Sequence, residues 1–108
     1  MSYLVELTQE AETNRDEIYR YYLERSELGA HHWYLAYEGA ISFLEQNPNR
    51  FGVASEDAKH SVTLQQINFG TKPSRPTHRL IFTVDGNRVT VLTLRHLHQD
   101  RWHTEPEA

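Results

Sequence analysis

The stretch that decides the fold runs from Thr77 to Trp102 and reads THRLIFTVDGNRVTVLTLRHLHQDRW. Two runs of β-branched and large apolar residues, 80–84 and 89–94, flank the tripeptide Asp85-Gly86-Asn87. Glycine and asparagine tolerate positive φ, so this order predicts a β-hairpin. Both strands are rich enough in Leu, Ile, Phe and Val to be central strands of a sheet.

The character of the chain changes directly after the second of these strands. The residues there are ionisable or aromatic, namely Arg95, His96, His98, Asp100, Arg101, Trp102 and His103. A buried hairpin that ends in such a cluster predicts that binding or chemistry is placed at one rim of the sheet.

The length of the turn decides which of these side chains share a face. A two-residue turn at Gly86-Asn87 places Arg79 opposite Leu94 and Thr77 opposite His96. Strand side chains alternate between faces, so Arg79 and His96 are then expected on the same face.

The same register sends Arg95 to the opposite face, beside His78, where it is expected to act as a structural ion-pair partner. A three-residue turn that includes Asp85 would shift the pairing by one residue and bring Arg95 to the face of Arg79. We favour the two-residue turn.

Upstream of this stretch, the chain predicts one strand and two helices. Tyr3–Leu7 has the composition of a short strand, and Thr8 stands in the N-cap position of a first amphipathic helix. Leu28-Gly29 interrupts the pattern, and a second helix is expected from about Ala30 to Glu45, before Pro48. The short break predicts an antiparallel helical hairpin, whose aromatic residues are expected to pack on a sheet rather than stack on bases.

Between the helices and the hairpin, residues 49–63 show no pattern that assigns a structure. Leu64–Phe69 is expected to be a strand with a bulge at Gln65-Gln66. The loop 70–76 follows and exposes Lys72 and Arg75.

The element order is therefore β-α-α-β-β-β. It predicts an α+β domain in which a helical hairpin packs on one face of a largely antiparallel four-stranded sheet. A chain of 108 residues makes a single domain, here 1–108, with a core from about 3 to 102 and a flexible tail at 103–108.

The composition of the chain indicates its cellular compartment and the kinds of partner it can bind. No segment has the length of a membrane span or the pattern of a signal peptide, and no cysteine is present, so we expect a cytoplasmic protein without membrane contact. The formal net charge is −4, but the two halves differ. Residues 1–60 hold five Lys and Arg against eleven Asp and Glu, whereas residues 61–108 hold six against four. An anionic partner is therefore possible at the basic rim, but general capture of a polyanion is disfavoured.

Cofactor motifs are few. A zinc site built from His96, His98 and His103 is a weak alternative, because a His-x-His pair without an assigned third ligand has little specificity. There is no Gly-rich phosphate loop, nucleophile elbow or dinucleotide fingerprint, so no cofactor and no metal are expected.

Taken together, the elements and motifs resemble those of the RelE/ParE toxin superfamily over residues 3–102. The residues that carry the resemblance are Tyr3–Leu7, the spacing of Trp33, Ala40, Ile41, Leu44 and Pro48, the segments 78–82, 84–87 and 89–94, and Arg95-His96 through Arg101.

This resemblance implies the toxin of a bacterial type II toxin–antitoxin module, held inactive by a cognate antitoxin protein. Members similar to RelE cleave messenger RNA on the ribosome, and members similar to ParE inhibit DNA gyrase. Twelve aromatic residues are more than a domain of this size readily buries, which also favours a protein partner that covers apolar surface.

The ribonuclease alternative can be set out from its chemistry. RNA cleavage without a metal needs a base, an acid and cations on the phosphorane. These residue types are supplied by Arg79, Arg95, His96, His98 and Arg101, with Lys72 and Arg75 as further phosphate contacts.

Departures from the ribonuclease branch favour the ParE-like branch. The chain has only two lysines, His78 stands before Arg79 where tyrosine is frequent, and no tyrosine follows the last strand. The leading candidates for function are Arg79, His96 and Arg101, with Arg95 and His98 in second rank. A third reading is a family member that has lost toxicity and only binds its partner.

Overall fold

A computed structural model describes residues 2–50, 52, 54, 63–72 and 74–98. The elements in chain order are β1 (Leu4–Leu7), α1 (Gln9–Leu23), α2 (Glu27–Gln46), the short 3₁₀ helix η1 (Pro48–Arg50), β2 (Gln65–Phe69), β3 (His78–Asp85) and β4 (Arg88–His96). This order confirms the predicted β-α-α-β-β-β arrangement. The predicted tail at 103–108 lies outside the described residues.

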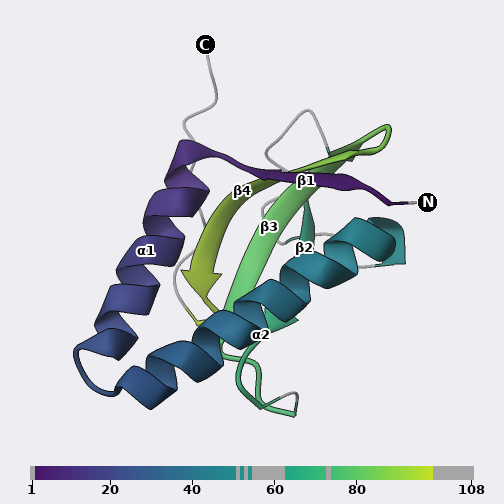
Figure 1. Cartoon of the computed structure of the whole chain (residues 1–108). Helices are drawn as coiled ribbons and strands as arrows, with labels where there is room; N and C mark the ends of the chain where they lie inside the picture. Colours follow the sequence, from purple (N-terminus) through teal and green to yellow (C-terminus); the bar gives the residue numbers. More distant parts are fainter. Residues whose placement is uncertain (1, 51, 53, 55–62, 73, 99–108) are drawn as a thin grey trace.

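The four strands form one sheet in the order β1-β4-β3-β2. The β2–β3 and β3–β4 pairs are antiparallel, and β1 runs parallel to β4. The two strands of the hairpin are therefore central, as predicted. Both helices cover one face of the sheet, which we call the helix face, and the opposite side is called the outer face (Figure 1).

The helix boundaries follow from their caps. The side chain of Thr8 accepts a hydrogen bond from the backbone of Ala11, which confirms the predicted start of α1. The start of α2 was predicted too late, because Ser26 caps the helix by accepting from the backbone of Gly29. Leu28-Gly29 therefore lies in the first turn of α2 rather than in the break between the helices.

The main core lies between the helices and the sheet. It contains Trp33, Tyr37 and Leu44 of α2 together with Leu80 and Phe82 of β3. Apolar residues recur on one side of α2 at helical spacing, so this burial accounts for the helix being held on the sheet. The prediction that the helix aromatics pack against the sheet is confirmed for Trp33 and Tyr37.

A smaller apolar cluster lies on the outer face. Ala54, Leu64 and Ile81 are buried together there, and Leu92 packs partly against them. This cluster explains why β3 is buried on both faces over most of its length.

The hairpin turn has the predicted length of two residues. Asp85 pairs with Arg88, and Gly86 has a φ of 61°, at the first central position where a type II′ turn requires glycine. The register breaks further along, because Phe82 pairs with Val91 while Ile81 pairs with Thr93. A β-bulge with Leu92 as the extra residue therefore lies in β4.

The bulge predicted at Gln65-Gln66 of β2 is wrong. Residues 65–69 pair with β3 in one unbroken antiparallel register. The polar character of Gln65 and Gln66 reflects their positions near a sheet edge, where side chains meet solvent.

The edge of β4 beyond the short strand β1 is covered by α1. The Oδ1 atom of Asn14 accepts from the Thr93 hydroxyl at 2.8 Å and from the Leu94 backbone at 3.1 Å. The Thr8 hydroxyl donates to the Leu92 carbonyl at 2.9 Å. These side chains replace the strand that would otherwise satisfy the β4 backbone.

We expect Asn14→Ala to lower the free energy of unfolding by about 1–3 kcal/mol, because it leaves two donors without an acceptor. Chemical denaturation followed by circular dichroism measures the change. Thr13→Ala on the exposed side of the same helix is the control and should change stability by less than about 0.5 kcal/mol. Equal stability of the two variants would show that Asn14 does not hold the β4 edge.

Candidate functional site

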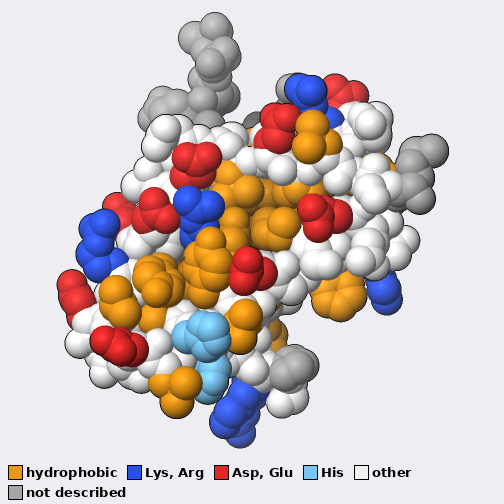
Figure 2. Space-filling view, viewed as in Figure 1, with side chains coloured by type: hydrophobic (Ala, Val, Ile, Leu, Met, Phe, Trp, Pro, Cys, Tyr) orange, Lys and Arg blue, Asp and Glu red, His pale blue; other side chains and the backbone are white. Residues whose placement is uncertain are grey.

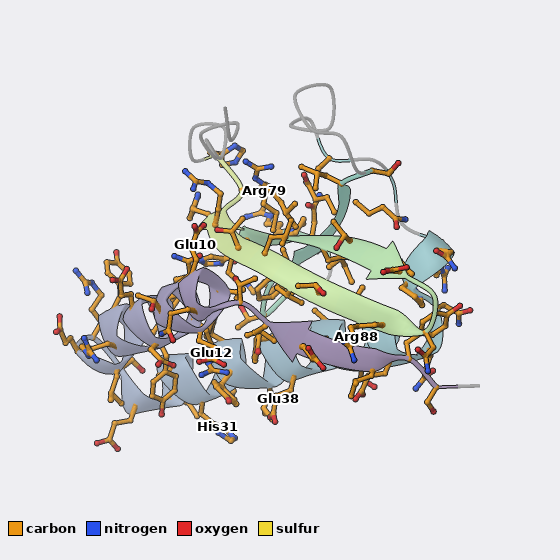
Figure 3. The ribbon with its side chains drawn as sticks, turned by 90° about the horizontal axis from the view of Figure 1, so that it is seen from above. Glu10, Glu12, His31, Glu38, Arg79 and Arg88 are labelled. Carbon is orange, nitrogen blue, oxygen red and sulfur yellow. The ribbon has the colours of Figure 1, made fainter. Side chains whose placement is uncertain are left out.

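At the end of the hairpin away from the turn, residues of the same type face one another across β3 and β4. Arg79 pairs with Arg95, and His78 pairs with His96. Neighbouring strand residues project from opposite faces, so the arginines and the histidines lie on different faces. His78 shares its side with Leu80 of the main core, which places the arginine pair on the outer face. Figure 3 shows Arg79 on the side of the sheet away from the helices.

The predicted register is wrong at this end of the hairpin. The extra residue at Leu92 shifts the pairing by one, so Arg95 rather than His96 shares the face of Arg79. For the same reason, Arg95 does not project beside His78.

Arg79 is held within a polar row that crosses the outer face. Only 4% of its surface is exposed, and its Nη1 donates to Oε1 of Gln66 at 3.1 Å. Gln66 in turn donates from Nε2 to Oδ1 of Asn68 at 2.7 Å. The row Asn68–Arg79–Arg95 thus runs from the edge of β2 to β4.

Arg95 is the last residue of this row, and its surroundings lower the stability of the folded protein. Its side chain is partly buried, and its Nε atom has no hydrogen-bond partner among the described residues. Directly across the strand pair lies the like charge of Arg79, an arrangement that is destabilising. Features that oppose folding in this way are concentrated at functional positions, so the Arg79–Arg95 pair is the first candidate site.

His78 belongs to an aromatic cluster on the helix face. Its ring lies 5.7 Å from Trp33, 5.9 Å from Phe69 and 5.3 Å from His96, measured between ring centroids. Burial, with a smaller contribution from His96, lowers the pKa of His78 to about 4. His78 is therefore uncharged at neutral pH, and its role is packing and hydrogen bonding rather than phosphate binding.

The hydrogen bonds of His78 fix its tautomer. Trp33 Nε1 can only donate, and it lies 3.4 Å from Nδ1 of His78, while the Thr77 hydroxyl lies 2.8 Å from the same atom. Nδ1 is thus the acceptor, and the proton of the neutral ring is on Nε2.

His96 and His98 continue from this cluster into solvent. Both are exposed, and the His98 backbone N–H donates to Nδ1 of His96 at 3.2 Å. Their ring centroids are 5.8 Å apart. The structure therefore groups His96 with His78 and His98, and separates it from the arginine pair.

The remaining predicted site residues lie elsewhere. Lys72 and Arg75 are exposed on the loop between β2 and β3, where the Arg75 backbone N–H bonds the Lys72 carbonyl at 2.9 Å. Arg101 and His103 lie outside the described residues. Within the part of the chain that the structure describes, no three His, Asp or Glu side chains gather as metal ligands.

Sequence reasoning missed two parts of this rim. One is the buried position of His78, and the other is the outer row that starts at Asn68. Both depend on the bulge at Leu92 or on the β2–β3 register, and neither has a signal in the order of residues alone.

The molecule also exposes apolar surface. Six large hydrophobic side chains, on the helices and β1, are 42–64% exposed: Leu4, Tyr21, Leu23, Leu28, Leu35 and Phe43. Figure 2 shows hydrophobic side chains gathered on the face of the molecule that carries α1 and α2. Such surface marks a site of interaction with another protein. None of the helices described is long and apolar enough to cross a lipid bilayer.

Comparison with known proteins agrees with this architecture. The model of a family described as the ParE toxin of the type II toxin–antitoxin system, parDE, matches residues 5–101. A search of curated proteins found no match. Among solved structures, the toxin–antitoxin complex RelBE2 from Mycobacterium tuberculosis contains a chain of similar fold, with a TM-score of 0.52 and 18% identity. That similarity covers 89% of this chain and 99% of the other.

The family match spans nearly the whole chain and includes both helices and, apart from Leu4 at the start of β1, all four strands. It also includes the arginine pair and the histidines of the rim. The chain belongs to the ParE toxin family of type II toxin–antitoxin systems.

Proposed function

We propose that the toxin acts in the ParE-like manner, by binding DNA gyrase and inhibiting growth until a cognate antitoxin neutralises it. Arg95, the more exposed member of the Arg79–Arg95 pair on the outer face, is the proposed contact with the target, and the buried Arg79 lies opposite it. Gyrase lies inside the cell, so this function places the toxin in the cytoplasm.

This proposal is supported by the positions of the arginines and the histidines, which lie on opposite faces of the sheet. The described neighbours of the arginine pair on the outer face include the amides Gln66 and Asn68, the hydroxyl of Thr93 and the apolar Ile81. His78 and His96 belong to the other face. A phosphate held by the two arginines would therefore meet no described imidazole as acid or base, which favours binding of a protein target over cleavage of RNA.

A second candidate function rests on the pair itself. Two arginines that pair across β3 and β4 on one face supply guanidinium groups of the type that suits the charge of a phosphodiester in its transition state. This feature favours the RelE-like alternative, a metal-free endoribonuclease acting on ribosome-bound messenger RNA. A third alternative, a member that binds its antitoxin without being toxic, predicts neither activity.

The partner in the resting state is proposed to be the antitoxin, consistent with the exposed apolar side chains of the helices and β1. Co-expression with the neighbouring gene product should give a stable heterocomplex. A monodisperse toxin that ignores that product would argue against the proposal.

An assay with purified toxin tests directly whether gyrase is the target. We expect the toxin to inhibit supercoiling by gyrase, and its induction to give filamentous cells with DNA damage signalling while translation continues. The parallel assay offers the toxin translating ribosomes and reads transcript cleavage. Cuts within ribosome-bound messages, with gyrase unaffected, would replace the gyrase proposal by the RelE-like one.

A further inference from the structure

Gln66 of β2 lies beside the Arg79–Arg95 pair and contacts one of its two members. Its Oε1 accepts a hydrogen bond from Nη1 of Arg79 at 3.1 Å, and its Nε2 donates to Oδ1 of Asn68 at 2.7 Å. Gln66 and Asn68 are two residues apart on β2, so both project from the outer face with Arg79. One amide therefore joins the buried arginine to an exposed side chain at the edge of the sheet.

The arginine fixes the direction of these hydrogen bonds. A guanidinium group can only donate, so the atom of Gln66 that faces Arg79 is the amide oxygen. The amide nitrogen of Gln66 is then turned toward Asn68, which presents its own oxygen. Asn68 thus holds the Gln66 amide in the one orientation that accepts from Arg79, because a flipped amide would set two donors against each other.

The contact with Gln66 lies on the side of Arg79 away from Arg95. Arg79 is on the central strand β3, between Asn68 of β2 and Arg95 of β4. The hydrogen bond to Gln66 draws the guanidinium of Arg79 toward β2, and repulsion by the like charge of Arg95 favours the same direction. If the acceptor on β2 is removed, other rotamers of Arg79 come within reach, including those directed toward β4.

We propose that Gln66 is a positioning residue for the target contact: held by Asn68, it keeps Arg79 on the β2 side of the row, so that Arg95 can turn to the target. This inference rests on the proposed function for the role of Arg95. A hydrogen bond from a guanidinium is charge-assisted, so a neutral amide is sufficient to orient Arg79 without placing a negative charge in the site.

Two substitutions of Gln66 separate the hydrogen bond from the shape of the side chain. Gln66→Met has a similar length and removes the acceptor, whereas Gln66→Glu keeps an oxygen at the same position and is the conservative variant. Strand geometry places the new carboxylate about 12 Å from Arg95, two strands across and two residues along. This distance exceeds the screening length of about 8 Å at physiological ionic strength, so the added charge should have little effect on target binding.

NMR of the Arg79 side chain measures its position directly. The residue is only 4% exposed, so its Nε–H group is shielded from solvent. We expect the order parameter of this group to exceed about 0.8 in the native toxin and in Gln66→Glu, and to fall below about 0.6 in Gln66→Met. Far-UV circular dichroism checks that each variant is folded.

Binding to purified gyrase is measured on the same variants, and growth after induction is read beside it. We expect Gln66→Met to bind roughly tenfold more weakly, the effect of one lost hydrogen bond to a charged group, and Gln66→Glu to bind within about threefold of the native toxin. Gln65→Met, on the same strand but on the opposite face, is the control and should bind as the native toxin does. Asn68→Ala should shift both measurements in the direction of Gln66→Met, and Asn68→Asp, which keeps the accepting oxygen, should not.

Three results would overturn the inference. An order parameter that stays high in Gln66→Met shows that other contacts hold Arg79. Native binding by a Gln66→Met toxin in which Arg79 is disordered shows that its position does not matter. Weak binding by Gln66→Glu with an ordered Arg79 shows that charge, rather than position, controls the site.

Failure of the proposed function gives a different result. The native toxin then does not bind gyrase, or Arg95→Met binds gyrase as well as the native toxin does. In that case the order parameter still decides whether Gln66 positions Arg79, and growth inhibition after induction decides whether that position matters for toxicity.

Discussion

Replacing Arg95 by methionine is expected to abolish growth inhibition and to raise the thermal stability of the toxin. The two effects have one cause, the position of Arg95 opposite Arg79 across β3 and β4. Methionine keeps the apolar contacts of the arginine stem and removes both the like charge and the buried Nε atom.

The expected gain in stability follows from the energies of the like-charge pair and of the buried Nε atom. A like-charge pair across two strands costs up to about 1 kcal/mol, and a buried donor without a partner costs about 1–3 kcal/mol. A gain of about 1 kcal/mol raises the thermal midpoint of a domain of this size by roughly 4–8 °C. Differential scanning calorimetry measures the shift.

The expected loss of activity is larger. Removing one charged group from a desolvated contact costs about 2–5 kcal/mol, which weakens target binding by roughly thirtyfold or more. Arg88→Met on the same strand is the matched control, since Arg88 is exposed and lies 3.9 Å from Glu6. Growth after induction, read beside binding to the purified target, should distinguish the two variants.

The variant His96→Ala then tests which face of the sheet carries the functional site. If Arg95→Met stays fully toxic while His96→Ala loses toxicity, the site lies on the helix-face rim with His78 and His98. Arg79→Met is expected to follow Arg95→Met in activity, with a smaller gain in stability because Gln66 loses its donor.

The sequence predicted the fold well because its signals are local. The residues that define the hairpin turn, the cap at Thr8 and the periodicity of α2 each act over a few neighbours. The start of α2 was missed because Ser26, a favourable cap, precedes a glycine that weakens the helical pattern.

The Arg79–Arg95 pair was harder to predict than the fold, because the pairing of these residues depends on one extra residue in β4. Thr90 to Leu94 is uniformly suited to a strand, so nothing in the sequence marks Leu92 as the extra residue. The structural reason lies far away in the chain, where the side chains of Thr8 and Asn14 bond the β4 backbone around the bulge. A contact of this kind becomes visible only when α1 is placed beside β4.

Acid is expected to destabilise the toxin through His78. The folded-state pKa of this imidazole is about 4, below the value of 6.5 for an exposed ring. As pH falls below 6.5, the unfolded chain takes up a proton that the folded protein does not, until pH 4 is reached. Stability from the neutral ring is therefore complete above pH 6.5 and is lost between pH 6.5 and pH 4.

The loss amounts to roughly 1–3 kcal/mol, the lower figure applying if water screens the ring. His78→Phe removes the titration and keeps an aromatic ring against Trp33 and Phe69. The variant should lose stability at pH 7, because Trp33 Nε1 loses its acceptor, and should show a flatter dependence on pH.

Urea denaturation between pH 7 and pH 4.5 measures this slope. The control is His31→Gln, an exposed histidine on α2, which should leave the slope as in the native toxin. The ring of His96 faces the ring of His78 at a centroid distance of 5.3 Å, so His78→Phe combined with His96→Gln tests whether this contact contributes to the slope. A native slope in His78→Phe would show that His78 does not carry the acid sensitivity of the toxin.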